Sequence, residues 1–98
     1  MITMRLSEAA DTLGTTFSGE DVLFQGCSTD SRHTNDGELF IALRGEFHDG
    51  HDFVEQARSQ GANAALVERS LPLDLPMIVV DNARMAMGKL AEHWRTHF

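Results

Sequence analysis

Residues 38–43 read ELFIAL, a short apolar run that stands between Gly37 and Gly45. A run of this length that is bounded by glycines predicts a buried β-strand. Polar segments lie on both sides of it, TDSRHTNDG over residues 29–37 and a second loop over residues 44–52. The two loops lie at opposite ends of the strand in sequence. Whether they meet in space depends on how each loop folds back.

Helices and further strands are expected to alternate on either side of this run. The first helix is SEAADTLG, in which Ser7 can cap the start and Gly14 can end the last turn. A second helix follows the loop within HDFVEQARSQGA, where Phe53, Val54 and Ala57 share one face and Gly61 is a natural stop. The other expected strands are VLFQGCS (22–28), NAALVE (63–68) and PMIVV (76–80).

The last predicted helix is ARMAMGKLAEHWRTHF, for which Asp81 or Asn82 can act as the cap. Its apolar stripe has helical spacing and consists of Met87, Leu90, Ala91 and Trp94. Trp94 is most simply a core residue, although it could also dock against a neighbouring domain. Alternation of strands and helices predicts an α/β fold with a small mixed, partly parallel sheet flanked by helices. Residues 1–98 are expected to form a single domain, and ligands of such folds sit in the loops beyond the strand ends.

The overall charge and composition narrow the classes of partner. The formal net charge of -7 argues against nucleic-acid binding or acidic-membrane binding driven by bulk electrostatics, although it leaves room for a local basic pocket. Cys27 is the only cysteine, so an intramolecular disulfide is impossible. The chain begins without the apolar run of a signal peptide and has no membrane-spanning stretch. We therefore expect a cytoplasmic protein without nucleic-acid or membrane partners.

The second loop, GEFHDGHDF over residues 45–53, is dense in imidazoles and carboxylates. His48 and His51 with their neighbouring aspartates could form a metal site and support a small metal-dependent hydrolase. Zinc sites need three or four converging ligands, however, and this pair straddles Gly50 at a junction between loop and helix. The favoured interpretation is that Asp49 or Asp52 caps the following helix, with the histidines facing solvent or hydrogen-bonded in the loop, and that no metal is bound.

Two other kinds of chemistry have weak support in the sequence. Cys27, Ser28, Ser31 and His33 could suggest a nucleophile and a base, but nothing places a base beside a hydroxyl, and free cysteines are most often small core residues. Neither the P-loop pattern nor a dinucleotide fingerprint is present, so the chain has no recognisable site of its own for ATP or a dinucleotide.

The segments STDSR (28–32) and ALRGEFHDGH (42–51) offer a different possibility, the binding of a nucleotide. Short hydroxyl side chains on a turn can recognise the carbonyl and N–H groups of a planar ring such as uracil. Gly45 and Gly50 let backbone approach a ligand closely, and Arg32 and Arg44 could pair with a pyrophosphate. Residue types alone nevertheless favour a solvated turn with a surface pair between Asp30 and Arg32.

The order of these motifs resembles the Mur ligase family over essentially the whole chain. The matching patterns are S-T-D-S-R, G-E-L-F-I-A-L-R-G-E-x-x-D-G-H-x-F, A-x-x-x-G-A-x-A-A-L-V and I-V-V-D-x-A-R-x-A-M-G-x-L-A. The closest branch adds D-alanyl-D-alanine to UDP-MurNAc-tripeptide in cytoplasmic peptidoglycan precursor synthesis. The sibling branch that adds the third amino acid is the alternative. A regulatory module of similar fold, resembling the N-domain of bacterial HPr kinase, is a further one.

The resemblance implies an N-terminal domain that binds the UDP end of the UDP-MurNAc-peptide substrate. A central ATPase domain and a C-terminal domain would be its partners, with ATP and Mg²⁺ in the central domain, so this domain would bind no cofactor and supply no catalytic residue. Its role would be positioning of the substrate. Carried over onto this sequence, the UDP-binding residues are Thr29, Ser31, Arg32, Arg44, Gly45, Glu46, Phe47 and His48.

Overall fold

The computed structural model describes residues 3–97, and the side chains of residues 3–96. Its main sheet has five strands in the order β2-β7-β6-β5-β4. The bounds are β2 Phe17–Ser18, β4 Cys27–Ser28, β5 Leu39–Ile41, β6 Ala64–Val67 and β7 Met77–Val79. Strands β4 to β7 run parallel to one another, while β2 pairs antiparallel with β7. The predicted mixed, partly parallel sheet is confirmed, and the ELFIAL run supplies β5 between β4 and β6.

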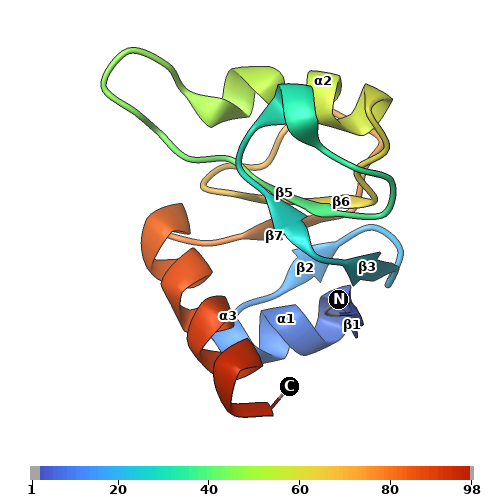
Figure 1. The fold of residues 1–98 in the computed structure, drawn as a ribbon, viewed down its shortest axis with the longest axis vertical. Helices are drawn as coiled ribbons and strands as arrows, with labels where there is room; N and C mark the ends of the chain where they lie inside the picture. Colours follow the sequence, from blue (N-terminus) through green and yellow to red (C-terminus); the bar gives the residue numbers. More distant parts are fainter. Residues whose placement is uncertain (1–2, 98) are drawn as a thin grey trace.

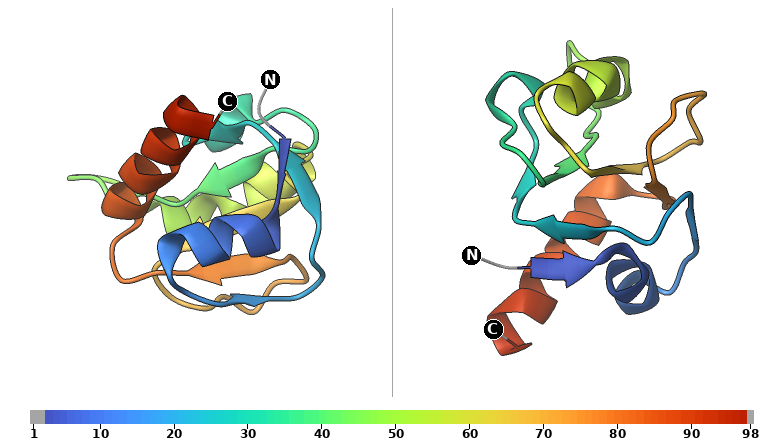
Figure 2. Two further views of the ribbon diagram at one scale, coloured as in Figure 1. Left: turned by 90° about the horizontal axis from the view of Figure 1, so that it is seen from below. Right: turned by 90° about the vertical axis from the view of Figure 1, so that its right-hand side faces the viewer.

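Helices cover both faces of this sheet (Figure 1). Helix α2 (Val54–Ser59) lies on one face, and helices α1 (Leu6–Leu13) and α3 (Ala83–His97) lie on the other. The right-hand view of Figure 2 shows the same three layers from the side. Along β5, Leu39 and Ile41 pack in the core with α1 and α3, whereas Phe40 packs with α2. Burial of both faces is the reason why this strand reads as a continuous apolar run.

The predicted strand over residues 22–28 is wrong as a single element. Gly26 adopts a left-handed conformation (φ 72°) and divides it into β3 (Leu23–Gln25) and β4. Strand β3 leaves the main sheet and pairs antiparallel with β1 (Thr3–Arg5) in a sheet of two strands. Strands β1 and β2 are three and two residues long. Such short pieces carry too little periodicity to be predicted.

The ends of α1 and α3 correct some of the predicted caps. Ser7 is not the cap of α1, because the helix begins at Leu6 and the Ser7 N–H donates to Asp21 Oδ1 at 2.9 Å. Gly14 is confirmed as the left-handed C-cap. For α3 the cap is Asn82, whose Oδ1 accepts from the Met85 N–H at 3.0 Å. No helix within residues 3–97 combines the length and apolar character that a bilayer crossing needs.

The apolar faces of α2 and α3 also differ from the prediction at one residue each. In α3 the buried residues are Ala83, Ala86, Leu90 and Trp94, with Met87 packed against them, whereas Ala91 is exposed. In the second helix Val54 and Ala57 are buried as expected, but Phe53 precedes α2 in the 3₁₀ turn η2 (Gly50–Phe53) and is 37% exposed. The ring of Phe53 is therefore available to the loops instead of the core.

Candidate functional site

The two polar loops meet at one edge of the main sheet. Strands β4 and β5 are parallel neighbours, so the segments that follow them leave the sheet at the same edge. The segment after β4 forms the 3₁₀ turn η1 (Ser31–His33), which contacts α2. The segment after β5 projects outward on the face of the sheet that α2 covers before it enters η2 (Figure 1). The first loop then leads back to the start of β5 through Gly37, whose N–H donates to the Gly61 carbonyl at 2.8 Å.

A cleft of about 330 Å³ lies between these two loops. The β4 loop contributes Asp30, Ser31 and Arg32, the β5 loop contributes His48, and residues from η2 and α2 complete the lining with Phe53 and Gln56. Three of the eight predicted site residues, Ser31, Arg32 and His48, are thus brought together. The cleft combines hydroxyl, amide, guanidinium and aromatic groups within one small space.

The wall formed by the β4 loop is fixed by hydrogen bonds to α2 and within the loop. Ser31 is buried, and its hydroxyl donates to Gln56 Oε1 at 2.7 Å. Asp30 caps η1, since its Oδ1 accepts from the Arg32 N–H at 3.0 Å, and the Arg32 guanidinium lies 3.3 Å away. Donation from that guanidinium, followed by the backbone N–H, lowers the pKa of Asp30. The surface ion pair between Asp30 and Arg32 that the residue types favoured is therefore present, and it lies at the rim of the cleft.

The opposite wall is a tight turn at the start of the β5 loop. Arg44 and Asp49 pair as an antiparallel bridge, and within it the Gly45 N–H donates to the His48 carbonyl at 2.7 Å. Glu46 and Phe47 form the tip of this turn, where Phe47 is 84% exposed. The ring of His48 meets Phe53 edge to face, with 6.1 Å between the ring centroids. These two rings give the cleft an aromatic side.

His51 anchors the same loop from inside. Its imidazole is buried, and Nε2 accepts from the Glu68 N–H at 2.8 Å, so the ring proton must reside on Nδ1. That Nδ1 donates to Asp49 Oδ1 at 2.6 Å, while Arg69 lies 3.3 Å from Asp49 Oδ2. The His51 backbone N–H and then its ring, with a smaller contribution from Arg69, lower the pKa of Asp49 to about 2. Asp49 is also the N-cap of η2, as one of the predicted alternatives required.

Neither the metal hypothesis nor the nucleophile hypothesis gains support from this geometry. Both ring nitrogens of His51 are engaged in hydrogen bonds, and within residues 3–96 no three His, Cys, Asp or Glu side chains converge as a potential metal site. Cys27 is half-buried in β4, where desolvation, followed by the charge of Glu38, raises the pKa of its thiol. That shift favours the protonated, less reactive form of the thiol.

Arg44 and Gly45 line a second recess, on the other side of the turn. Here the Arg44 Nε lies 2.8 Å from Glu68 Oε1, and the recess has a volume of about 440 Å³. Its lining is completed by Leu43, Glu68, Asn82 and Arg84. Gly50 also differs from expectation, since a Cβ there would come within 2.7 Å of the Leu43 backbone. Gly50 is therefore needed for close contact with the backbone of Leu43, and not for contact with a ligand.

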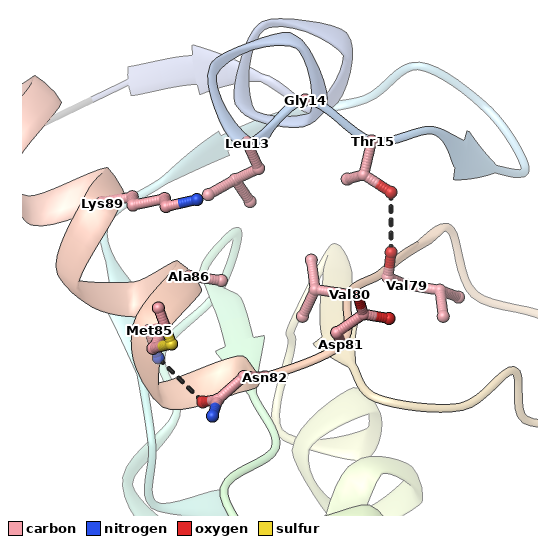
Figure 3. Close-up of a pocket in the computed structure, with 10 residues that line it drawn as sticks. All are labelled: Leu13, Gly14, Thr15, Val79, Val80, Asp81, Asn82, Met85, Ala86 and Lys89. Atoms are coloured by element: carbon pink, nitrogen blue, oxygen red, sulfur yellow. Dashed lines mark hydrogen bonds between the residues drawn. The ribbon is translucent and has the colours of Figure 1, made fainter.

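A third hollow, of about 380 Å³, lies between the end of α1 and the start of α3 (Figure 3). On one side of it the Thr15 hydroxyl donates to the Val79 carbonyl at 2.9 Å, and Lys89 extends from α3 toward Leu13. None of the predicted site residues lines this hollow. This hollow can therefore serve as a control site in experiments that measure ligand binding at the cleft.

Comparison with known proteins now decides the family. The pattern described as "Mur ligase family, catalytic domain" matches residues 23–95. The chain belongs to the Mur ligase family. A relative from Escherichia coli (strain K12), UDP-N-acetylmuramoyl-tripeptide--D-alanyl-D-alanine ligase, is 44% identical over 91 residues. The alignment covers 93% of this chain and 20% of that protein, so the chain spans about a fifth of the relative's length.

Other relatives of this Mur ligase chain belong to two branches. UDP-N-acetylmuramoyl-L-alanyl-D-glutamate--2,6-diaminopimelate ligase from Geobacillus thermodenitrificans (strain NG80-2) is 48% identical over 63 residues, covering 64% of this chain and 13% of that protein. Among solved structures, MurF from Acinetobacter baumannii matches with a TM-score of 0.89 and 28% identity. That match covers 98% of this chain and 22% of the other. The fold and the family resemblance inferred from the motifs are confirmed.

The remaining predicted residues of this Mur ligase domain lie outside the cleft. Thr29 is exposed beside Asp30, and Glu46 and Phe47 stand at the tip of the turn. Three residues of the cleft were not among the predicted UDP-binding residues: Asp30, which was favoured as a surface partner of Arg32, Phe53, which had been assigned to a helical face, and Gln56, which had no assigned role. Gln56 follows the buried Val54 by two residues, so helical periodicity places it away from the buried face of α2. That periodicity is the one sequence signal that could have singled out Gln56.

Proposed function

We propose that this Mur ligase domain binds the UDP end of UDP-MurNAc-tripeptide in an ATP-dependent ligase that adds D-alanyl-D-alanine during peptidoglycan precursor synthesis. Support comes from the E. coli relative of that name, which aligns with 93% of the chain at 44% identity. The observation that carries the proposal is the cleft between the β4 and β5 loops, because it unites Ser31, Arg32 and His48.

The groups around the cleft suit a uridine nucleotide. A uracil ring presents two carbonyl acceptors and one N–H donor, which a hydroxyl and a side-chain amide can satisfy. The Ser31 hydroxyl donates to Gln56 Oε1 at 2.7 Å, and both residues line the cleft. The edge-to-face rings of His48 and Phe53 supply an apolar side on which a base can pack.

In this proposal the domain holds the substrate, and the bond is made elsewhere in the protein. ATP and Mg²⁺ would bind in a central domain, where ATP would phosphorylate the substrate carboxylate and leave as ADP. The D-alanyl-D-alanine amine would then attack the acyl phosphate and displace inorganic phosphate. Residues of this chain would contribute by positioning the muramoyl peptide, which lowers the entropic part of the barrier. The proposed location is the cytoplasm, where the UDP-linked precursor is made.

The ligase that adds the third amino acid is the second candidate, because the Geobacillus thermodenitrificans relative is 48% identical. That match covers 64% of the chain, against 93% for the E. coli relative, so the first candidate is preferred. Assay of the full-length enzyme with D-alanyl-D-alanine and with diaminopimelate separates the two. We expect product with D-alanyl-D-alanine and none with diaminopimelate. Product with diaminopimelate only would overturn the first candidate, and product with D-alanyl-D-alanine only would overturn the second.

A single substitution tests the cleft itself in the full-length enzyme. Ser31→Ala is expected to raise the KM for the UDP-linked substrate by about 10-fold while leaving the KM for ATP unchanged, since it removes one buried hydroxyl contact. Ser18→Ala, on β2 at the other edge of the sheet, is the matched control and should change neither value. An unaltered KM in a folded Ser31→Ala enzyme would contradict the assignment.

A further inference from the structure

We propose that the hollow between the end of α1 and the start of α3 (Figure 3) binds a short zwitterionic peptide, a dipeptide with small apolar side chains. In this site Lys89 holds the carboxylate of the peptide, and Asp81 holds its ammonium group. The hollow shares no lining residue with the cleft between the β4 and β5 loops, so the inference is independent of the proposed function.

Two unpaired charges of opposite sign line this hollow. Within residues 3–96, neither Lys89 nor Asp81 has a group of opposite charge within ion-pair distance, and neither side chain forms a hydrogen bond. Figure 3 shows Lys89 extending from α3 on one side of the hollow and Asp81, which follows β7, on another. A ligand that carries both charges satisfies both side chains, whereas a simple anion or cation leaves one of them unpaired.

The two helix ends that border the hollow do not neutralise these charges. Gly14 caps α1, because its N–H donates to the Ala10 and Asp11 carbonyls. Asn82 caps α3, because its Oδ1 accepts from the Met85 N–H at 3.0 Å. A helix end carries a partial charge of only about half a unit. The full charges of the ammonium and the carboxylate therefore remain available to a ligand.

The rest of the lining suits the body of a dipeptide. The Asn82 Nδ2 remains free to donate to a peptide carbonyl, since the Oδ1 of the same amide is the atom that caps α3. The Thr15 hydroxyl donates to the Val79 carbonyl, so its oxygen can still accept from a peptide N–H. The apolar walls, against which small aliphatic side chains can pack, are formed by Leu13, Val80, Met85 and Ala86.

The volume of the hollow limits the ligand to a small one. At about 380 Å³ it is near the lower end of the range for ligand pockets, about 300–1,000 Å³. Two extended residues span about 7 Å, so a dipeptide can place its charged ends near different sides of such a space.

Two other hollows of the described chain lack this combination of charges. One, beside α1, is lined by Glu8 and Asp11 without a basic side chain. The other, beside β2, is lined by Glu20 and Asp74, also without a basic side chain. A zwitterion would therefore find a partner for only one of its charges in either of them.

NMR titration of the ¹⁵N-labelled 98-residue chain with L-alanyl-L-alanine tests the site. We expect the dipeptide to shift the amides of Gly14, Thr15, Val80 and Ala86. Its N-acetyl form lacks the ammonium group and its C-terminal amide lacks the carboxylate, so each should bind about 5-fold more weakly. If the dipeptide shifts none of these amides at millimolar concentration, the proposal is overturned.

Two variants assign the two ends of the ligand. Lys89→Gln is expected to raise the Kd for the dipeptide about 5-fold and to leave the Kd for the C-terminal amide unchanged, because the amide has no carboxylate for Lys89 to hold. Asp81→Asn should raise the Kd for the dipeptide by a similar factor and leave the Kd for the N-acetyl form unchanged. Folded variants that weaken all three ligands alike, or none, would contradict the assignment.

Arg95→Gln and Glu20→Gln are the matched controls. Each removes a charge of the same sign as one of the variants, and neither residue lines the hollow. Arg95 lies about 9 Å further along α3 than Lys89, and Glu20 lies in the loop after β2. Both controls should leave the Kd for the dipeptide unchanged. Weakening by the controls as large as that by Lys89→Gln and Asp81→Asn would mean that only the overall charge matters, and the site would be wrong.

Discussion

His48 and His51 belong to the same loop, three residues apart, and their surroundings are opposite. His48 is exposed and reaches the cleft, where its ring meets Phe53. His51 is buried, and both of its ring nitrogens are held by hydrogen bonds. The loop GEFHDGHDF therefore has two halves, an open turn over residues 45–48 and an anchored segment over residues 49–53.

The contrast between the two halves shows how an exposed wall of the cleft can be kept in place. The anchored segment is tied to the Glu68 backbone, directly after β6, and to Arg69 through Asp49. The open turn has no buried side chain, and its position depends on the bridge between Arg44 and Asp49. Substitutions in the anchored half should thus lower stability, whereas substitutions in the open half should change ligand affinity.

The largest expected effect is that of His51→Ala. The Glu68 N–H would lose its buried partner, and the Asp49 carboxylate would lose the imidazole donor, so we expect a loss of about 3 kcal/mol in the free energy of unfolding. His48→Ala should stay within about 0.5 kcal/mol of the parent. Urea denaturation measures both variants. Equal losses for the two histidines would remove the distinction between the two halves.

Gly50→Ala and Gly45→Ala form a second pair within the loop. A Cβ at position 50 would lie 2.7 Å from both N and O of Leu43, so the backbone must shift, and we expect a loss of about 2 kcal/mol. A Cβ at position 45 would meet only the His48 carbonyl, at 3.4 Å, and Gly45→Ala should cost less than about 0.5 kcal/mol. Thermal denaturation checks the order, and a reversed order would contradict the account.

Acid titration examines the anchor through Asp49. Its pKa is lowered from 3.8 to about 2 in the folded chain, so ionised Asp49 stabilises the fold above about pH 4. That contribution should disappear as the pH falls from about 4 to about 2. Asp49→Asn should lack this part of the pH dependence, by about 1 kcal/mol between the two ends of the window. Parallel pH profiles for parent and variant would show that the anchor does not depend on the charge.

The smallest expected effect concerns Phe47 at the tip of the open turn. Since its side chain is 84% exposed and lines neither neighbouring hollow, Phe47→Ala should alter stability by less than about 0.5 kcal/mol. We expect it to change the Kd for UDP less than His48→Ala does, by about 2-fold at most. Calorimetric titration provides the comparison. A larger effect of Phe47→Ala would move the contact from the wall of the cleft to the tip of the turn.

Much of the fold was predictable because β5, β6 and β7 are buried on both faces and so read as apolar runs. The two-residue strand β2 and the break at Gly26 were not, since they depend on tertiary pairing and on one left-handed glycine. In the site, Ser31, Arg32 and His48 could be chosen from motifs, whereas Arg44 and Gly45 lie in the adjoining recess. The partner of His51 is the backbone N–H of Glu68, which directly follows β6 and lies 17 residues away in the sequence, so it leaves no trace in the local sequence.

The most direct test of the cleft is the set of intermolecular NOEs from the uracil H5 and H6 protons of bound UDP. We expect contacts with the ring protons of His48 and Phe53, which form the aromatic side of the cleft. NOEs from the same protons to Leu13, Thr15 or Lys89, in the hollow of Figure 3, would contradict it.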